Sequence, residues 1–259
     1  MPAIALVAAG ARLGLSLGKI FGGHGFDVAL IARSKERLGE LTEKLAAEGV
    51  TAAGFPADVT DCSALAAALD SAAGRFGGID MLHYSSPGAG TTETLRSTGA
   101  LDVTVDNLRP QIESICYGAI AATQAVLPAM LESKWGRIIN IASTAGVTGY
   151  AYVTTYCAAK HGMIGLTRAL AMETARTGVT VNAVCPGYTD TEMTSQTIAN
   201  ITKKTGRSRE EALASLVTHN PQGRLIQPSE VADAVVWLCG DNAASVTGQS
   251  IVVAGGEVL

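Results

Sequence analysis

The feature that most constrains this chain is a regular alternation of short apolar segments with longer helical patterns. IALVAA (4–9) precedes a helical pattern from about Leu13, and DVALIA (27–32) precedes another over 34–49. Further strand candidates follow at 51–58, 79–85, 136–143, 179–186 and 249–255. Strands that are apolar throughout and separated by helices are typical of a parallel sheet covered on both faces. The pattern predicts a doubly wound, Rossmann-like α/β fold.

The composition excludes several classes of protein. Apolar residues make up 47% of the 259 residues and charged residues 16%, which suits a large buried core. The net charge of −4, without a basic stripe, argues against nucleic acid as a partner. No apolar run approaches the ~18 residues that a membrane span needs. The five cysteines are scattered and form no CxxC pair, so we expect a reduced, cytoplasmic protein without a metal site.

The domain organisation predicted from the sequence is one domain over residues 1–259. No repeat and no Pro/Ser-rich linker divides the chain. The polar, helical segment at about 192–223 interrupts the alternation shortly before the last helix and strand. An insertion after a late strand is a candidate substrate lid at the carboxyl edge of the sheet. The alternative is an ordinary surface pair of helices.

A glycine-rich turn follows the first predicted strand. It reads AAGARLGLSLG, with Gly10 and Gly14 separated by three residues that include Arg12 and Leu13. Glycines let the backbone approach a phosphate, and the N-terminus of the following helix offers free N–H groups. The position of the turn favours a dinucleotide site over a simple turn.

The end of the second predicted strand bears on which dinucleotide binds. NAD sites carry an acidic residue there for the ribose 2′-hydroxyl, whereas NADP sites favour a cation. This chain has Ala32 followed by Arg33. We therefore predict NADP(H) in preference to NAD(H), with Arg33, assisted by Arg12, on the 2′-phosphate. The alternative is that Arg33 is only a solvated residue at a helix start.

Three residues in the second half suggest the chemistry. Ser143 ends a predicted strand, Tyr156 follows 13 positions later, and Lys160 lies four residues beyond it. On a helix, residues four apart share one face, so the ammonium group is expected to lower the pKa of the phenol toward neutrality. Such a phenol can donate or accept a proton, while Ser143 hydrogen-bonds the same substrate oxygen. The set suits hydride transfer coupled to proton transfer.

The glycine turn, Ser143, the YxxxK pair and VNAVCPG together resemble the short-chain dehydrogenase/reductase family over essentially the whole chain. The second half is similar to polyketide ketoreductases and hydroxyacyl-CoA dehydrogenases, and the first half to a divergent branch. The resemblance implies that Tyr156 is the general acid/base, that Lys160 holds the nicotinamide ribose and that Ser143 orients the substrate. The cofactor contacts that it implies are Asp58, Val59, Pro186, Gly187, Thr189 and Thr191. Segments near the C-terminus look like part of a homotetramer interface.

The chain also departs from the family pattern. Ala9 and Ser16 stand where the glycine turn usually has threonine and glycine, and YSSPG replaces Asn-Asn-Ala-Gly, with Ser85 nearest the cofactor. A further catalytic asparagine of many members falls at Ile115, with Ser114 as a substitute if the register differs by one. An isoleucine side chain cannot hold the water that would link Lys160 to solvent, so Ile115→Asn is expected to raise turnover if this proton relay limits the rate.

Three functions remain open from the sequence. The first is an NADP(H)-dependent oxidoreductase that interconverts a ketone and a secondary alcohol, with a β-ketoacyl or polyketide-like compound as the first substrate class to try. The second is an NAD-dependent hydroxyacyl-CoA dehydrogenase. The third is a catalytically silent nucleotide-binding protein, suggested by Ile115 and the YSSPG loop.

Overall fold

The computed structural model describes residues 1–8, 10–86 and 99–258, and within them the chain forms one seven-stranded sheet. All strand pairs are parallel, in the order β3-β2-β1-β4-β5-β6-β7. The strands are β1 (Ala3–Val7), β2 (Asp27–Ala32), β3 (Ala52–Pro56), β4 (Met81–Tyr84), β5 (Gly136–Ile141), β6 (Val179–Pro186) and β7 (Ser250–Val253). The predicted doubly wound α/β fold is confirmed. The predicted strand 4–9 ends earlier, at Val7, and Ala9 lies outside the described residues.

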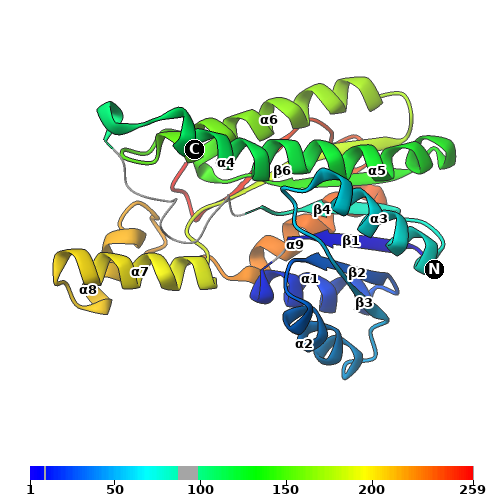
Figure 1. The fold of residues 1–259 in the computed structure, drawn as a ribbon, viewed down its shortest axis with the longest axis horizontal. Helices are drawn as coiled ribbons and strands as arrows, with labels where there is room; N and C mark the ends of the chain where they lie inside the picture. Colours follow the sequence, from blue (N-terminus) through cyan, green and yellow to red (C-terminus); the bar gives the residue numbers. More distant parts are fainter. Residues whose placement is uncertain (9, 87–98, 259) are drawn as a thin grey trace.

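Helices cover both faces of the sheet, as Figure 1 shows. One apolar cluster joins the sheet to α1 (Ala11–Gly23), α2 (Lys35–Ala46) and α9 (Pro228–Cys239). The other joins it to α3 (Cys62–Phe76), α5 (Gly118–Ser133) and α6 (Thr154–Thr174). Because both faces are covered, the inner strands are buried along their length, which explains their continuous apolar sequences.

A long, interrupted helix crosses one face of the sheet. It consists of α4 (Val105–Ile112), a π-helical turn over Glu113–Tyr117, and α5. By length and composition alone, Val105–Ser133 is the one helix among the described residues that could cross a membrane. In the fold it packs against α3, α6 and the sheet, so its apolar side is accounted for by the core.

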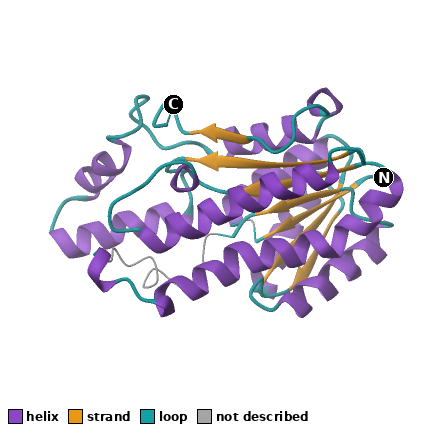
Figure 2. Cartoon of the chain, turned by 90° about the horizontal axis from the view of Figure 1, so that it is seen from above, coloured by secondary structure: helices purple, strands orange, loops and turns teal. Residues whose placement is uncertain are grey.

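The strand order reverses between β1 and β4, and the strands all point the same way in Figure 2. In doubly wound sheets, ligands bind outside the carboxyl ends of the strands at such a switch point. Beyond this edge project α7 (Glu192–Thr205) and α8 (Arg209–Val217), which share a small apolar cluster of their own around Ile198 and Leu216. The predicted helical segment at 192–223 therefore stands next to the expected ligand crevice.

Candidate functional site

Ser143 lies just beyond the carboxyl end of β5. Its backbone is extended, and its hydroxyl oxygen accepts the Ala145 N–H at 3.1 Å, which caps a short 3₁₀ turn over Thr144–Gly146. The side chain also lies close enough to Tyr156 to lower the pKa of its phenol. The cap fixes the backbone of Ser143 at the sheet edge, so its hydroxyl is held next to the phenol.

Tyr156 and Lys160 occupy consecutive turns at the start of α6. The Lys160 side chain is almost fully buried, and its Nζ donates to the carbonyl oxygens of Ser86 at 3.0 Å and Ile141 at 2.8 Å. Nζ lies 5.6 Å from the centroid of the Tyr156 ring. An ammonium group has three N–H donors, so one remains to face the pocket.

The protonation of this pair differs from the expectation that Lys160 brings the phenol toward neutrality. Burial raises the pKa of Tyr156 to about 12, against a lowering effect of the Ser143 hydrogen bond. Burial also lowers the pKa of Lys160 to about 7. A lysine side chain that is only partly protonated at neutral pH stabilises a phenolate weakly. In the protein alone, therefore, Tyr156 is a protonated donor.

One pocket of about 350 Å³ collects most of the predicted site. It is lined by these predicted residues: Gly10, Leu13, Ser85, Ser143, Tyr156, Lys160, Pro186, Gly187, Thr189 and Thr191. The predicted residues Arg12, Gly14, Arg33, Asp58 and Val59 do not line it. Side chains from α7, including Met193 and Thr197, close one wall. The structure thus brings together segments from β1, β4, β5, α6 and β6.

The glycine turn leads into the N-terminus of α1, which is open to a ligand. Gly10 precedes the helix without a side-chain cap, and the first turn of α1 contains no acidic residue. A Cβ on Gly10 would lie 3.7 Å from the Glu192 carboxylate, so the turn faces the start of α7. Uncapped N–H groups at a helix N-terminus suit a phosphate.

The two arginines predicted for the 2′-phosphate lie in different surroundings. The Arg12 guanidinium pairs with Asp190 and lies 3.8 Å from the Glu192 carboxylate, both from the segment leading into α7. Arg33 is 77% exposed and stands 3.9 Å from Asp58 at the ends of neighbouring strands. Arg33 is therefore the freer cation. The Asp58 carboxylate accepts hydrogen bonds from the backbone N–H and the hydroxyl of Thr60, which fixes the turn after β3.

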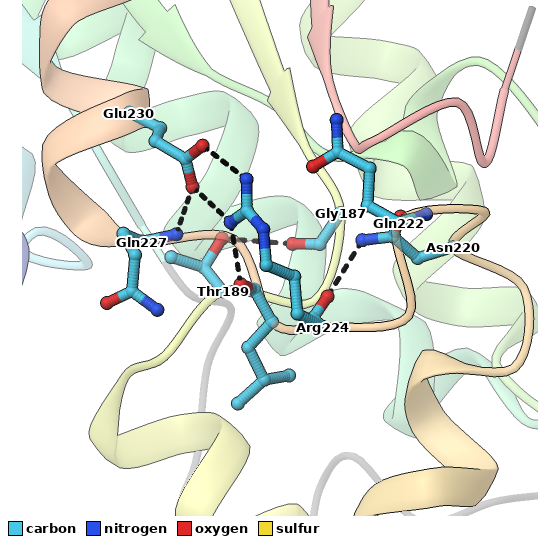
Figure 3. A network of polar contacts seen from close by, with 8 residues as sticks. Gly187, Thr189, Asn220, Gln222, Arg224, Gln227 and Glu230 are labelled. Carbon is cyan, nitrogen blue, oxygen red and sulfur yellow. Dashed lines mark hydrogen bonds and ion pairs between the residues drawn. The ribbon is translucent and has the colours of Figure 1, made fainter.

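The segment after β6 is held by a polar network (Figure 3). Arg224 makes two hydrogen bonds of 2.7 Å to Glu230, whose pKa they lower to about 2, and Glu230 accepts the Gln227 N–H. The Asn220 side chain donates to the Arg224 carbonyl. Backbone hydrogen bonds between Tyr188, Asp190 and Ile226 connect this network to the pocket wall. The loop of Gly187, Thr189 and Thr191 is thereby fixed before any ligand binds.

The departures from the family pattern have visible consequences. Ile115 is fully buried in the apolar cluster beneath α5, and Ser114 lies beside it in the π-helical turn, with its hydroxyl 3.5 Å from the Gln111 carbonyl. Ser85 lines the pocket as expected, while Pro87 and Gly88 of YSSPG lie outside the described residues.

The sequence did not reveal a second polar group at the pocket. The Tyr150 hydroxyl donates to the Glu257 carboxylate at 2.5 Å and accepts a hydrogen bond from the Thr144 hydroxyl at 2.8 Å. Tyr150 lines the pocket, whereas Glu257 comes from the C-terminal segment, more than 100 residues away. No local pattern signals such a contact.

Comparisons with known proteins agree with this geometry. A sequence profile of the family described as "Enoyl-(Acyl carrier protein) reductase" matches residues 7–257. A Streptomyces coelicolor protein named "Putative ketoacyl reductase" is 39% identical, with 98% of this chain and 96% of that protein covered. The 3-oxoacyl-(acyl-carrier-protein) reductase FabG of Pseudomonas aeruginosa is 35% identical, with 99% and 97% covered.

A solved structure supports the same relationship. The crystal structure of an actinorhodin polyketide ketoreductase variant with NADPH superposes with a TM-score of 0.88 at 35% identity, covering 99% of this chain and 97% of that one. The fold, the serine, tyrosine and lysine at one pocket, and these matches show that the chain belongs to the short-chain dehydrogenase/reductase family. It is an oxidoreductase of this family with ketoreductase relatives.

Proposed function

We propose that this protein is an NADP(H)-dependent reductase that interconverts a ketone and a secondary alcohol. The observation that carries the proposal is the juxtaposition of Ser143, Tyr156 and Lys160 at one pocket with the open N-terminus of α1. The residues fit a dinucleotide phosphate, because the α1 terminus is uncapped and a cation, not an acid, follows β2. Bound NADPH supplies the hydride to the carbonyl carbon.

The protein groups handle the proton and the orientation of the substrate. Ser143 donates a hydrogen bond to the carbonyl oxygen, and Tyr156, protonated at neutral pH, donates its proton to that oxygen as hydride arrives. Lys160 would hold the nicotinamide ribose through its third N–H, while backbone carbonyls accept the other two. The α7–α8 pair acts as the substrate lid, since α7 already forms one wall of the pocket.

The substrate class that we propose is a β-ketoacyl or polyketide-like carbonyl compound. It rests on the ketoacyl reductase names of the relatives and on a pocket whose lining combines apolar side chains with many hydroxyl groups. The protein is expected to act in the cytoplasm as a homotetramer. The competing function is an NAD-dependent hydroxyacyl-CoA dehydrogenase, and the cofactor separates the two.

Paired equilibrium titrations of the purified protein with NADPH and NADH, followed by nicotinamide fluorescence, test the proposal. NADPH is expected to bind more tightly. In Arg33→Asp the NADPH/NADH affinity ratio is expected to fall at least about tenfold, because a charge-assisted contact to phosphate is replaced by repulsion. Lys44→Asp, with the same change in charge near the end of α2, serves as the control and should leave the ratio unchanged.

Two outcomes of these titrations would count against the proposal. An unchanged ratio in Arg33→Asp would remove Arg33 as the selector, and tighter NADH binding to the native protein would favour the dehydrogenase. Failure of both cofactors to bind at sub-millimolar concentration would mean that the nucleotide site is disabled and would favour a catalytically silent member of the family. Reduction of ketones with NADPH would exclude that last reading.

A further inference from the structure

Tyr84 is a fully buried tyrosine at the end of β4 and the first residue of YSSPG, the segment that departs from the family pattern. Its ring belongs to the apolar cluster shared by the sheet, α3, α5 and α6. Its hydroxyl donates to the backbone carbonyl of Ser114 at 2.5 Å. A buried phenol needs such a partner, because an unpaired hydroxyl in an apolar interior is costly.

The acceptor lies where the long helix changes its hydrogen-bond pattern. In a regular α-helix the Ser114 carbonyl would accept the N–H of Gly118, four residues on. Here the Gly118 N–H donates to the Glu113 carbonyl, five residues back, within the π-helical turn. The hydroxyl of Tyr84 takes the place of that donor at Ser114 and so stabilises the turn.

Gly118 makes room for this contact. A Cβ at position 118 would lie 2.0 Å from the Tyr84 hydroxyl oxygen and 2.8 Å from the Val59 carbonyl. Any larger residue would displace the phenol from Ser114. The tyrosine and the glycine are therefore matched to each other sterically.

The same tyrosine is connected to Lys160 through two residues of the β4 end. The side chain of Ser86, two residues after Tyr84 and therefore on the same side of the strand, lies close enough to the phenol to lower its pKa. The carbonyl of Ser86 accepts the Lys160 ammonium at 3.0 Å, and Ser86 is buried. A path of polar contacts thus runs from the π-helical turn through Tyr84 and Ser86 to Lys160.

We propose that Tyr84 is a positioning residue that orients the Ser86 carbonyl toward Lys160. In this chain it takes over the support that many family members obtain from an asparagine at the position of Ile115. It touches neither substrate nor cofactor and acts through Ser86. The catalytic consequence rests on the proposed function, since Lys160 holds the cofactor there. The effect on the ionisation of Lys160 does not depend on it.

Tyr84→Phe removes only the hydroxyl, and Tyr117→Phe is the matched control. Tyr117 lies in the same π-helical turn, is exposed, and has no hydrogen-bond partner among the described residues. The pKa of Lys160 can be measured without turnover, from the pH dependence of its acetylation by acetic anhydride, read by mass spectrometry. In Tyr84→Phe it is expected to fall by about half a unit, because the ammonium form loses a well-placed acceptor.

Kinetics give a second readout. For Tyr84→Phe we expect kcat for ketone reduction to fall about tenfold with KM nearly unchanged. The alkaline limb of the pH profile is expected to move to lower pH, because the pKa of Lys160 falls. Tyr117→Phe should match the native protein in both assays. An unchanged Lys160 pKa in a folded Tyr84→Phe protein overturns the proposal. If the native protein reduces no ketone, the proposed function fails, and acetylation still decides the role of Tyr84.

Gly118→Ala provides a second route should Tyr84→Phe fold poorly. It leaves the phenol intact but displaces it from Ser114, so the Lys160 pKa is expected to fall as well. In a Tyr84→Phe background the added methyl still meets the Val59 carbonyl at 2.8 Å but no longer meets a hydroxyl, so its effect on Lys160 should be smaller, and the difference between the two backgrounds reports the role of the Tyr84 hydroxyl. Equal effects of Gly118→Ala in both backgrounds would contradict a role of the Tyr84 hydroxyl.

Discussion

The neighbouring strands β4 and β5 end at the same pocket but contribute to it in different ways. They pair in register from Met81 with Arg137 to Tyr84 with Asn140, and both are buried throughout. Beyond β5, Ser143 follows the family pattern and the Ile141 carbonyl accepts Lys160. Beyond β4, YSSPG replaces that pattern, yet Ser86 also supplies a carbonyl to Lys160.

The difference between the two strands separates reaction chemistry from support. Under the proposed function, the β5 and α6 side carries the groups that meet the substrate, which are Ser143, Tyr156 and Lys160. The β4 side positions a backbone carbonyl, and different side chains can do that if their hydrogen bonds are satisfied. The family pattern is therefore retained where residues react and replaced where they hold other residues in place.

The largest expected effect tests the β5 and α6 side. Tyr156→Phe removes the proton donor while keeping the ring, so kcat for ketone reduction should fall about a thousandfold. Affinity for NADPH should change little, because Lys160 and the glycine turn remain. Tyr152→Phe, an exposed tyrosine two residues before α6, is the control and should retain full activity. Substantial turnover in Tyr156→Phe would show that another group donates the proton.

The next effect concerns Ile115, in the π-helical turn that Tyr84 of β4 contacts. From the sequence, Ile115→Asn was expected to raise turnover, but Ile115 is fully buried in an apolar cluster. An asparagine there loses apolar contacts and buries an amide, so we expect the free energy of unfolding to fall by about 3 kcal/mol. Urea unfolding measures it, and Ile115→Val should cost only about 1 kcal/mol. A stable, more active Ile115→Asn protein would restore the asparagine relay and weaken the role assigned to Tyr84.

The sequence predicted the sheet well because of a local signal. Buried parallel strands produce continuous apolar runs, and the predicted ranges 27–32 and 179–186 coincide with β2 and β6. The position of Tyr156 and Lys160 on one helix and at one pocket was predicted equally well, because their spacing is a property of that helix.

What the sequence could not predict depends on contacts between distant segments. The π-helical turn at Ser114 depends on Tyr84, 30 residues away, and Tyr150 meets Glu257 across 107 residues. The pairing of Arg12 with Asp190 spans 178 residues. The ionisation of Tyr156 and Lys160 also differed from expectation, because spacing reveals the neighbour but not the degree of burial.

The smallest effect tests the other side of β4. His83 points opposite to Tyr84, is fully buried, and has no hydrogen-bond partner for either ring nitrogen among the described residues. Burial lowers its pKa from 6.5 to about 3. The folded protein therefore keeps His83 neutral, while the unfolded chain binds a proton below about pH 6.5, so stability is lost as the pH falls from there toward 3.

His83→Leu should remove this contribution. The stability difference between His83→Leu and the native protein is expected to grow by about 2 kcal/mol in favour of the variant between pH 7 and pH 5, since each pH unit below 6.5 is worth about 1.4 kcal/mol. Urea unfolding at several pH values measures it, with the exposed His219→Gln as the control. Parallel pH profiles for His83→Leu and the native protein would mean that His83 finds a partner or a proton in the fold. His83 and Tyr84, the polar residues on the two faces of β4, would then both have partners. The supporting role that distinguishes β4 from β5 would extend beyond the pocket into the core.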